Sequence, residues 1–221
     1  MRDNESDKTN DPPAFVSETV EEKFAQLLVI AEKCVRERAT TPALILIYSA
    51  IDVAGWLSAA NPSAKPSSRF TGWVTKYLLP SSNLDCSPIE LYAARCGIVH
   101  NFSSESDLNR QNRRSVRQIV YSWGNADFDT LRAMTQIVNL DLPTPSAVQG
   151  RTAKYISIKV EDLISSFREG LIRFFAESKS DERLAARIQE RSGKVLTHMS
   201  KAHADELLDW TRRLLRKDSL P

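Results

Sequence analysis

Two side chains that could act on a phosphodiester stand close together in the segment YAARCGIVHNFS, residues 92–103. Arg95 and His100 lie five residues apart, near the expected end of an otherwise apolar helix. A histidine can take or give a proton near neutral pH, because its unperturbed pKa lies there. An arginine can donate planar, charged hydrogen bonds to phosphate oxygens as negative charge builds on them. Together they could cleave RNA without a metal, with the ribose 2′-hydroxyl as the attacking group.

The same two residues also have an ordinary structural interpretation. Asp52 is the only charged residue in the apolar segment over residues 43–60, and a buried carboxylate needs a compensating partner. Arg95 could serve only as that partner. His100 could serve only to place a favourable charge at a helix C-terminus. The residues alone leave both interpretations open.

A second arginine–histidine pair, Arg191 and His198, has six residues between its members. This pair straddles Gly193, where we expect a helix to break, so the context favours the first pair. His203 lies on an apolar helical stripe and is expected to be a core or interface residue. The three cysteines are far apart and form no C-x-x-C motif, so we expect neither a disulfide framework nor a structural zinc site. No metal and no cofactor are expected.

The densest basic cluster of the chain follows the first pair. It could guide a phosphate backbone toward Arg95 and His100, or it could be a solvated arginine face. Aromatic residues interleave poorly there, so no base-stacking platform is evident. The cluster consists of Arg110, Arg113, Arg114 and Arg117.

The overall composition sets limits on location and partners. The formal net charge of the 221 residues is +2, which by itself indicates neither a nucleic acid nor a membrane partner. No segment has the roughly 18 uninterrupted apolar residues that a membrane span needs. Residues 1–14 lack the apolar centre of a secretory signal and are predicted to be a disordered tail. We therefore expect a cytoplasmic protein without a membrane partner.

Helical periodicity dominates the chain, and two motifs mark helix starts. Thr19-x-x-Glu22 is a possible capping box, and Ser87-Pro88-Ile89-Glu90 combines a capping box with a proline at the first helical position. The helices expected to share one core cover residues 19–38, 41–60, 67–79, 87–100 and 161–178. The residues expected to be largely buried in that core are Trp56, Trp73, Leu91, Phe167 and Phe174. Two further helices are expected between residues 181 and 216.

Two segments alternate between apolar and polar residues as strands do. They cover residues 116–121 and 155–160, and we expect them to pair as a small ribbon. A helix is predicted between them, over residues 127–138. The ribbon is therefore an insertion near residues 113–160 in a single domain that extends over residues 15–221.

An arginine followed by four to six residues and a histidine resembles the motif of the HEPN superfamily, small helical bundles of which many are metal-independent ribonucleases. The string RCGIVHNF is similar to versions of the motif in bacterial HEPN-like proteins. The resemblance covers residues 19–102 and extends more weakly to residues 161–178. It implies a mainly α fold, a HEPN-like helical bundle with a small two-stranded β appendage. It also implies that Arg95 and His100 are catalytic, with Asp52 and Asn101 as supporting residues.

Two classes of function follow from this resemblance. The first is a metal-independent endoribonuclease, a toxin or defence effector, which acts as a homodimer because HEPN domains bring two motifs into one cleft about a two-fold axis. Its partners would be RNA and an antitoxin or other protein. The second is a non-catalytic HEPN-like module that binds a nucleotide, RNA or protein. Cys96 favours the second, because active ribonucleases usually have a polar residue after the arginine, whereas the arginine cluster favours the first.

Overall fold

The structure is a computed structural model that describes residues 19–103, 105–111, 115–122, 124, 129–131, 133 and 155–194. Most of these residues are helical, and two short strands form a small sheet. The sequence-based prediction of a mainly α protein with a two-stranded appendage is confirmed at this level. The expected tail over residues 1–14, most of the expected helix over residues 127–138 and the chain beyond residue 194 lie outside the described residues.

The first two helices form as their sequences predict. α1 spans Val20–Arg36 and begins with the expected capping box, in which the Thr19 hydroxyl accepts from the Glu22 N–H at 3.2 Å and the Glu22 carboxylate accepts from the Thr19 N–H at 2.7 Å. α2 spans Thr40–Ser58 and is apolar nearly all round. Because α2 packs against α1, α3, α4, α7 and α8, almost every face of it is covered, which accounts for that composition.

The third expected helix is divided into three parts. α3 spans Pro66–Trp73, a π-helical turn (η1) spans Val74–Leu78 and a 3₁₀ turn (η2) spans Leu79–Ser81. Pro80 lies in the last of these turns, since it can occupy a helix end but cannot continue an α-helix. The Arg173 side chain donates from Nε to the Tyr77 carbonyl at 3.0 Å, so a neighbouring helix satisfies an acceptor of the π-helical turn.

The further helices whose bounds the structure describes are α4 over Pro88–Asn101, α5 over Asp107–Gln111, α7 over Val160–Ser178 and α8 over Glu182–Ser192. The strands are β1 over Gln118–Ser122 and β2 over Tyr155–Lys159. They pair in parallel, with Gln118 opposite Tyr155 and Ser122 opposite Lys159. In the described part of the chain the sheet has no third strand, so the strands form an appendage to the helices and not a central layer.

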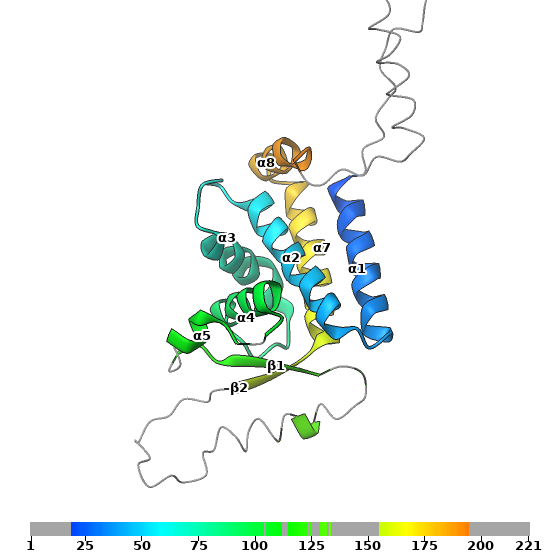
Figure 1. The fold of residues 1–221 in the computed structure, drawn as a ribbon. Helices are drawn as coiled ribbons and strands as arrows, with labels where there is room; N and C mark the ends of the chain where they lie inside the picture. The colour runs from blue at the N-terminus through cyan, green and yellow to red at the C-terminus, as the bar shows by residue number, and fades with distance from the viewer. Residues whose placement is uncertain are drawn as a thin grey trace, which may run out of the picture.

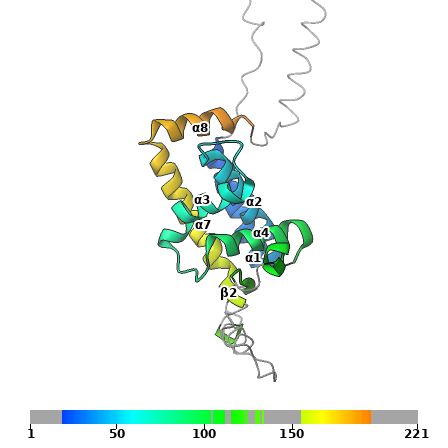
Figure 2. The ribbon, with the colours of Figure 1, turned by 90° about the vertical axis from the view of Figure 1, so that its left-hand side faces the viewer.

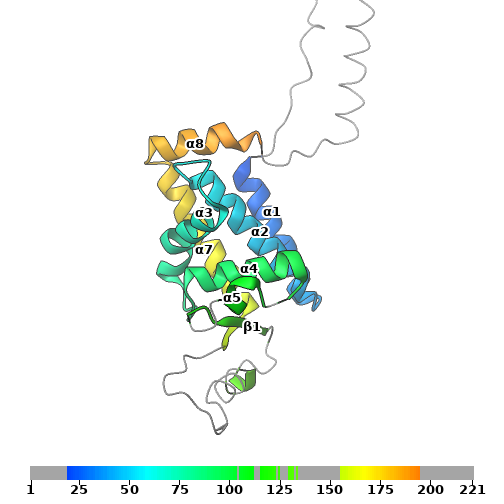
Figure 3. The same cartoon turned by 60° about the vertical axis from the view of Figure 1, so that its left-hand side comes forward.

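The helices form a bundle with a cap at each end. α1, α2 and α7 lie side by side along the molecule, and α4 packs across α2 and α3 (Figure 1). α8 lies across one end of the bundle, as the turned views show (Figures 2 and 3), and the small sheet lies at the other end. Four of the expected core residues are at most 1% exposed: Trp73, Leu91, Phe167 and Phe174. Trp56 is only half-buried and packs at the edge of the core.

Arg191 fixes α8 to the end of α2. Its side chain is buried, and Nη1 donates to the carbonyls of Trp56 and Ala59, the latter at 2.8 Å. The last carbonyls of a helix have no hydrogen-bond donor within it and carry partial negative charge. A buried guanidinium provides both the donors and a compensating positive charge. The guanidinium carbon also lies 5.7 Å from the centre of the Trp56 ring. The arginine of the second sequence pair therefore has a structural role, and its expected companion His198 lies outside the described residues.

Arg191→Ala is expected to lower the free energy of unfolding by about 2 kcal/mol, because it removes charged hydrogen bonds and leaves the α2 carbonyls buried without donors. Urea denaturation followed by far-UV circular dichroism measures this loss. Arg183→Ala, at an exposed position of the same helix, is the matched control. Equal stability of the two variants would contradict the capping role.

Candidate functional site

The helix that carries Arg95 and His100 is fixed at its first turn by a capping box. The Ser87 N–H donates to the Glu90 carboxylate at 2.7 Å, and the Ser87 hydroxyl accepts from the Glu90 N–H at 3.4 Å. Pro88 occupies the first helical position, where its missing N–H costs nothing. The helix ends at Asn101, and Phe102 follows in the left-handed conformation with φ of 51°. α4 therefore begins and ends as its local sequence predicts, within one residue.

Gly97, between the two motif residues, allows the chain to fold back over α4. A Cβ atom at this position would collide with the carbonyl oxygen of Ser103 and would lie 2.9 Å from that of Glu105. The Ser103 N–H donates to the Gly97 carbonyl at 3.2 Å, which holds the returning chain in place. The glycine of the motif thus has a packing reason, because only a residue without a side chain admits this approach.

Arg95 links the core helix α2 to His100. Its Nε lies 2.5 Å from Oδ2 of Asp52, and its Nη1 lies 3.0 Å from Nε2 of His100. The pairing of Asp52 with Arg95 was predicted from the sequence and is confirmed. The side chains of Arg95 and Asp52 remain 19% and 24% exposed, and His100 is exposed. We call Asp52, Arg95 and His100 the motif triad.

Partial burial changes the pKa values of two members of the triad, Asp52 and Arg95. Burial raises the pKa of the Asp52 carboxyl above its ordinary value, and the Arg95 guanidinium opposes that rise. Burial also lowers the pKa of the Arg95 guanidinium, but the Asp52 carboxylate outweighs burial and leaves that pKa raised. Asp52 is thus a carboxylate that is costly to bury and that depends on Arg95 for compensation.

The contact between Arg95 and His100 defines which ring nitrogen of the histidine accepts. A guanidinium can only donate, so Nε2 of His100 is the acceptor in this contact. If a phosphate oxygen took the Arg95 donor, Nε2 would become free to accept a proton. Arg95 and His100 can therefore present a charged donor and a base side by side to an exposed ligand.

Two other residues, Asn101 and Cys96, lie beside members of the triad in the sequence. Asn101 is exposed at the end of α4, and within the described part of the chain its side chain makes no hydrogen bond. Its expected supporting role stays a prediction. Cys96 is a free, half-buried thiol, as are Cys34 and Cys86. Burial raises the pKa of the Tyr92 hydroxyl, and the neighbouring Cys96 side chain raises it further.

The arginine cluster does not form one basic face in the part that the structure describes. Arg117 donates from its backbone N–H and its Nε to Oε1 of Glu90, at 3.1 and 2.6 Å, and from Nη2 to the Asp85 carbonyl at 3.1 Å. Arg110 pairs with Asp107 and lies 3.7 Å from Glu105. Arg113 and Arg114 lie outside the described residues. Arg117 therefore ties β1 to the start of α4, and most of its donors are engaged with Glu90 and Asp85, so its expected contact with RNA stays a prediction.

The carboxylate of Glu90 is the centre of this connection. Its side chain is 3% exposed, yet it accepts from Ser87, from the Arg117 backbone and from the Arg117 guanidinium. Burial raises the pKa of Glu90, but the Arg117 and Ser87 hydrogen bonds outweigh burial and leave it below the ordinary value of 4.5. A lowered carboxyl pKa favours the folded state above the ordinary pKa, and this contribution disappears as the pH falls toward the lowered value.

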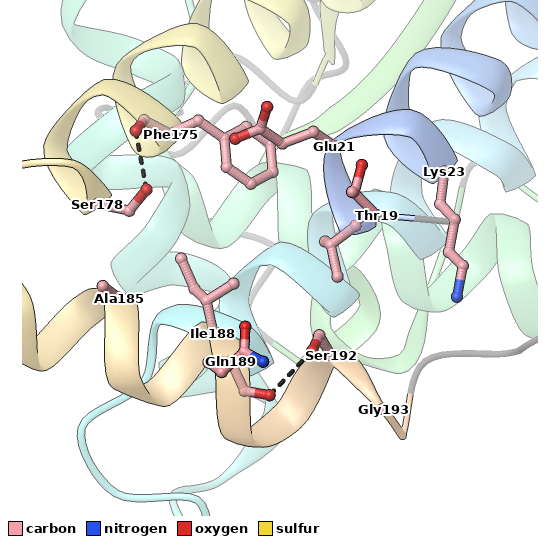
Figure 4. Close-up of a pocket in the computed structure, with 11 residues that line it drawn as sticks. Thr19, Glu21, Lys23, Phe175, Ser178, Ala185, Ile188, Gln189, Ser192 and Gly193 are labelled. Carbon is pink, nitrogen blue, oxygen red and sulfur yellow. Dashed lines mark hydrogen bonds between the residues drawn. The ribbon is translucent and has the colours of Figure 1, made fainter. Parts of the chain in front are cut away.

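Cavities lie at both ends of the bundle. One of about 490 Å³ lies between the start of α1, the end of α7 and α8 (Figure 4). Its serine hydroxyls donate to carbonyls of their own helices, Ser178 to Phe175 and Ser192 to Gln189, so they present no free donor to a ligand. A second cavity, of about 390 Å³, lies where α2 begins and α4 ends, next to the motif.

The described residues also bear on a metal site and on a membrane span. No group of three His, Cys, Asp or Glu side chains there could hold a metal ion. α2 is long and apolar enough to cross a membrane by length and composition alone, but its central position in the bundle explains the same composition.

Comparisons with known proteins found no match, either to a protein-family model, to a curated protein or to a solved structure.

Replacing Glu90 by Gln should cost about 3 kcal/mol of folding free energy at neutral pH, because Arg117 loses a buried charge partner. Since the pKa of Glu90 is lowered in the folded state, the wild-type protein should lose stability as the pH falls from about 6 to about 3, and Glu90→Gln should lose less over that window. Urea denaturation at a series of pH values measures both. Asp85→Asn, which changes a carboxylate that is 94% exposed, is the control and should leave the pH profile unchanged.

Asp52→Ala should lower the free energy of unfolding by about 1–2 kcal/mol, between the values for exposed and for fully buried ion pairs. A fully buried pair would lose about 3 kcal/mol, but both partners here retain some contact with water. Thermal and urea denaturation provide the measurement, with Asp85→Ala as the matched exposed control. A loss no larger than that of the control would show that the pair does not hold α4 to α2.

Proposed function

We propose that the protein is a HEPN-like, metal-independent endoribonuclease in which Arg95 and His100 act on the phosphodiester. The observation that carries this proposal is the 3.0 Å contact between Nη1 of Arg95 and Nε2 of His100. In this pair His100 is exposed to solvent, and Arg95 is paired with Asp52. A purely structural salt bridge would need Asp52 and Arg95 only. The exposed histidine adds a group that can move a proton.

The proposed reaction is an internal transfer of the phosphoryl group. Nε2 of His100 accepts the proton of the ribose 2′-hydroxyl, and the 2′-oxygen attacks the adjacent phosphorus. Arg95 moves one donor from His100 to a phosphate oxygen and stabilises the charge that develops there. The bond from phosphorus to the 5′-oxygen breaks, and that oxygen takes a proton. The products are a 2′,3′-cyclic phosphate and a 5′-hydroxyl.

Asp52 acts in this proposal through Arg95. Its carboxylate holds Nε of the guanidinium, which leaves the terminal nitrogens to face His100 and the ligand. One histidine and one arginine provide a base and a charged donor, but no separate acid for the leaving oxygen. A second copy about a two-fold axis would supply that acid from its own His100, which is why the proposal includes a homodimer.

The alternative function is a non-catalytic HEPN-like module that binds a nucleotide, RNA or protein with the same surface. Cys96 is the feature that favours it. This thiol is half-buried beside Arg95, at a position where the resemblance leads us to expect a polar side chain in an active ribonuclease. An antitoxin or other protein partner is compatible with either function.

The test is cleavage of RNA by the purified protein in the presence of EDTA. We expect fragments with 2′,3′-cyclic phosphate and 5′-hydroxyl ends, and no cleavage of DNA, which lacks the attacking hydroxyl. His100→Ala should reduce the rate by about 100- to 10,000-fold with the fold intact, and Arg95→Ala by about 100- to 1,000-fold with some loss of stability. His198→Ala, in the second arginine–histidine pair, is the matched control and should retain activity.

Two outcomes would refute this mechanism. One is cleavage that persists in His100→Ala, and the other is cleavage that requires Mg²⁺. If a folded protein cleaves no RNA but binds it, the binding-module function replaces the ribonuclease. Sedimentation of the same sample tests the homodimer independently of activity.

A further inference from the structure

The lining of the cavity next to the motif combines apolar residues with a cationic one. Its apolar side is formed by Leu44, Ile98 and the Tyr121 ring, and Phe102 stands at its border. Phe102 is 74% exposed, the most exposed large apolar side chain among the described residues. An exposed aromatic ring beside a cavity offers a flat face to a planar ligand.

Phe102 is also an unfavourable residue for its backbone conformation. Its φ of 51° is in the left-handed region, where a glycine or asparagine would be easier to accommodate. The ring makes little compensating contact with the core, because it is mostly exposed. Neither the helix end nor the packing therefore explains why a phenylalanine occupies this position.

The start of α2 also lines the cavity. The residue before this helix is Ala39, which provides no side-chain cap, and the first turn contains no acidic residue. The first N–H groups of a helix have no partner within it and carry partial positive charge, which favours an anion. Thr40 and Thr41 line the cavity there, and the buried Thr40 hydroxyl has no hydrogen-bond partner among the described residues.

Arg38 adds a full positive charge to the same wall. It lines the cavity, its side chain is exposed, and no carboxylate pairs with it in the described part of the chain. Arg38 and Phe102 are the two non-glycine residues with positive φ among the described residues, and both border this one cavity. The cavity lining thus includes both an aromatic ring and groups that can bind an anion.

We propose that this cavity binds one nucleotide of a single-stranded RNA, with the base on Phe102 and a phosphate at Arg38 and the start of α2. Both parts of the ligand have a complementary wall, and a volume of about 390 Å³ is of the size that small ligands occupy. A phosphate oxygen at the helix start would also supply an acceptor for the Thr40 hydroxyl. The bound segment must be single-stranded, because a base in a duplex is already stacked.

This subsite deepens the proposed function, on which it rests for its identification of RNA. Phe102 follows His100 by two residues, so their Cα atoms lie at most about 7.6 Å apart. A nucleotide held on Phe102 would therefore lie at the same end of α4 as His100. The cavity would position the chain, whereas Arg95 and His100 would act on it.

The test separates binding from cleavage by using the His100→Ala background. Affinity is measured by fluorescence anisotropy with a fluorescein-labelled single-stranded RNA of mixed sequence. Phe102→Ala and Arg38→Ala should each weaken binding by about tenfold. Phe102→Gly should weaken binding equally while leaving the melting temperature unchanged or higher, because glycine relieves the left-handed strain.

Matched controls lie nearby or on comparable surfaces. Arg36→Ala removes an exposed arginine two residues from Arg38, and Ile172→Ala removes an exposed apolar side chain on α7, where the exposed fraction is 57%. Both should bind the RNA as the parent does. The duplex form of the same RNA should bind more weakly than the single strand.

The outcomes distinguish this inference from the proposed function. If the wild-type protein cleaves RNA but the Phe102 and Arg38 variants bind like their controls, the subsite is wrong and the ribonuclease stands. If no RNA is cleaved but these variants still bind about tenfold more weakly than the controls, the subsite stands and the ribonuclease is wrong. Absence of any RNA binding, or equal affinity for the duplex, would overturn the subsite.

Discussion

The arrangement of the candidate site depends on one carboxylate placed in an otherwise apolar helix. Asp52 lies in α2, which packs against most of the other helices, and burial makes its charge costly. The 2.5 Å contact with Arg95 compensates for that cost and fixes α4 against the core helix. Nη1 of the same guanidinium lies 3.0 Å from Nε2 of His100. The ion pair with Asp52 therefore also orients His100, the exposed residue of the motif.

α4 is held at three levels, each by a different physical means. At its start, the carboxylate of Glu90 satisfies the helix N-terminus and binds Arg117 of the adjacent β1 segment. In its middle, Arg95 is paired with Asp52. At its end, Gly97 lets the returning chain lie directly on the helix. A helix restrained in this way can present an exposed histidine in a defined position, which catalysis and tight binding both require.

The arginines illustrate how tertiary contacts give different roles to one residue type. Arg191 caps the carbonyls of α2, Arg117 joins a strand to a helix, and Arg95 bridges an acid and a histidine. Arg38 has no carboxylate partner in the described part of the chain and faces a cavity. In the sequence, proximity suggested a basic cluster around residues 110–117, but its two described members are engaged with carboxylates. An arginine without a carboxylate partner among the described residues lies elsewhere, in the turn between the first two helices.

The sequence by itself determined the local structure, because capping boxes, helix-starting prolines and apolar periodicity act over a few residues. It therefore predicted the start of α4 at Ser87 and Pro88, and it also identified Asp52 as a charge that needs a partner, since burial follows from the composition of its helix. Only the tertiary structure decided which residues meet across long separations. The parallel pairing of the strands, the capping of α2 by Arg191 and the cavity between Arg38 and Phe102 each join segments far apart in the chain. Such contacts depend on how helices pack, and no short-range pattern records them.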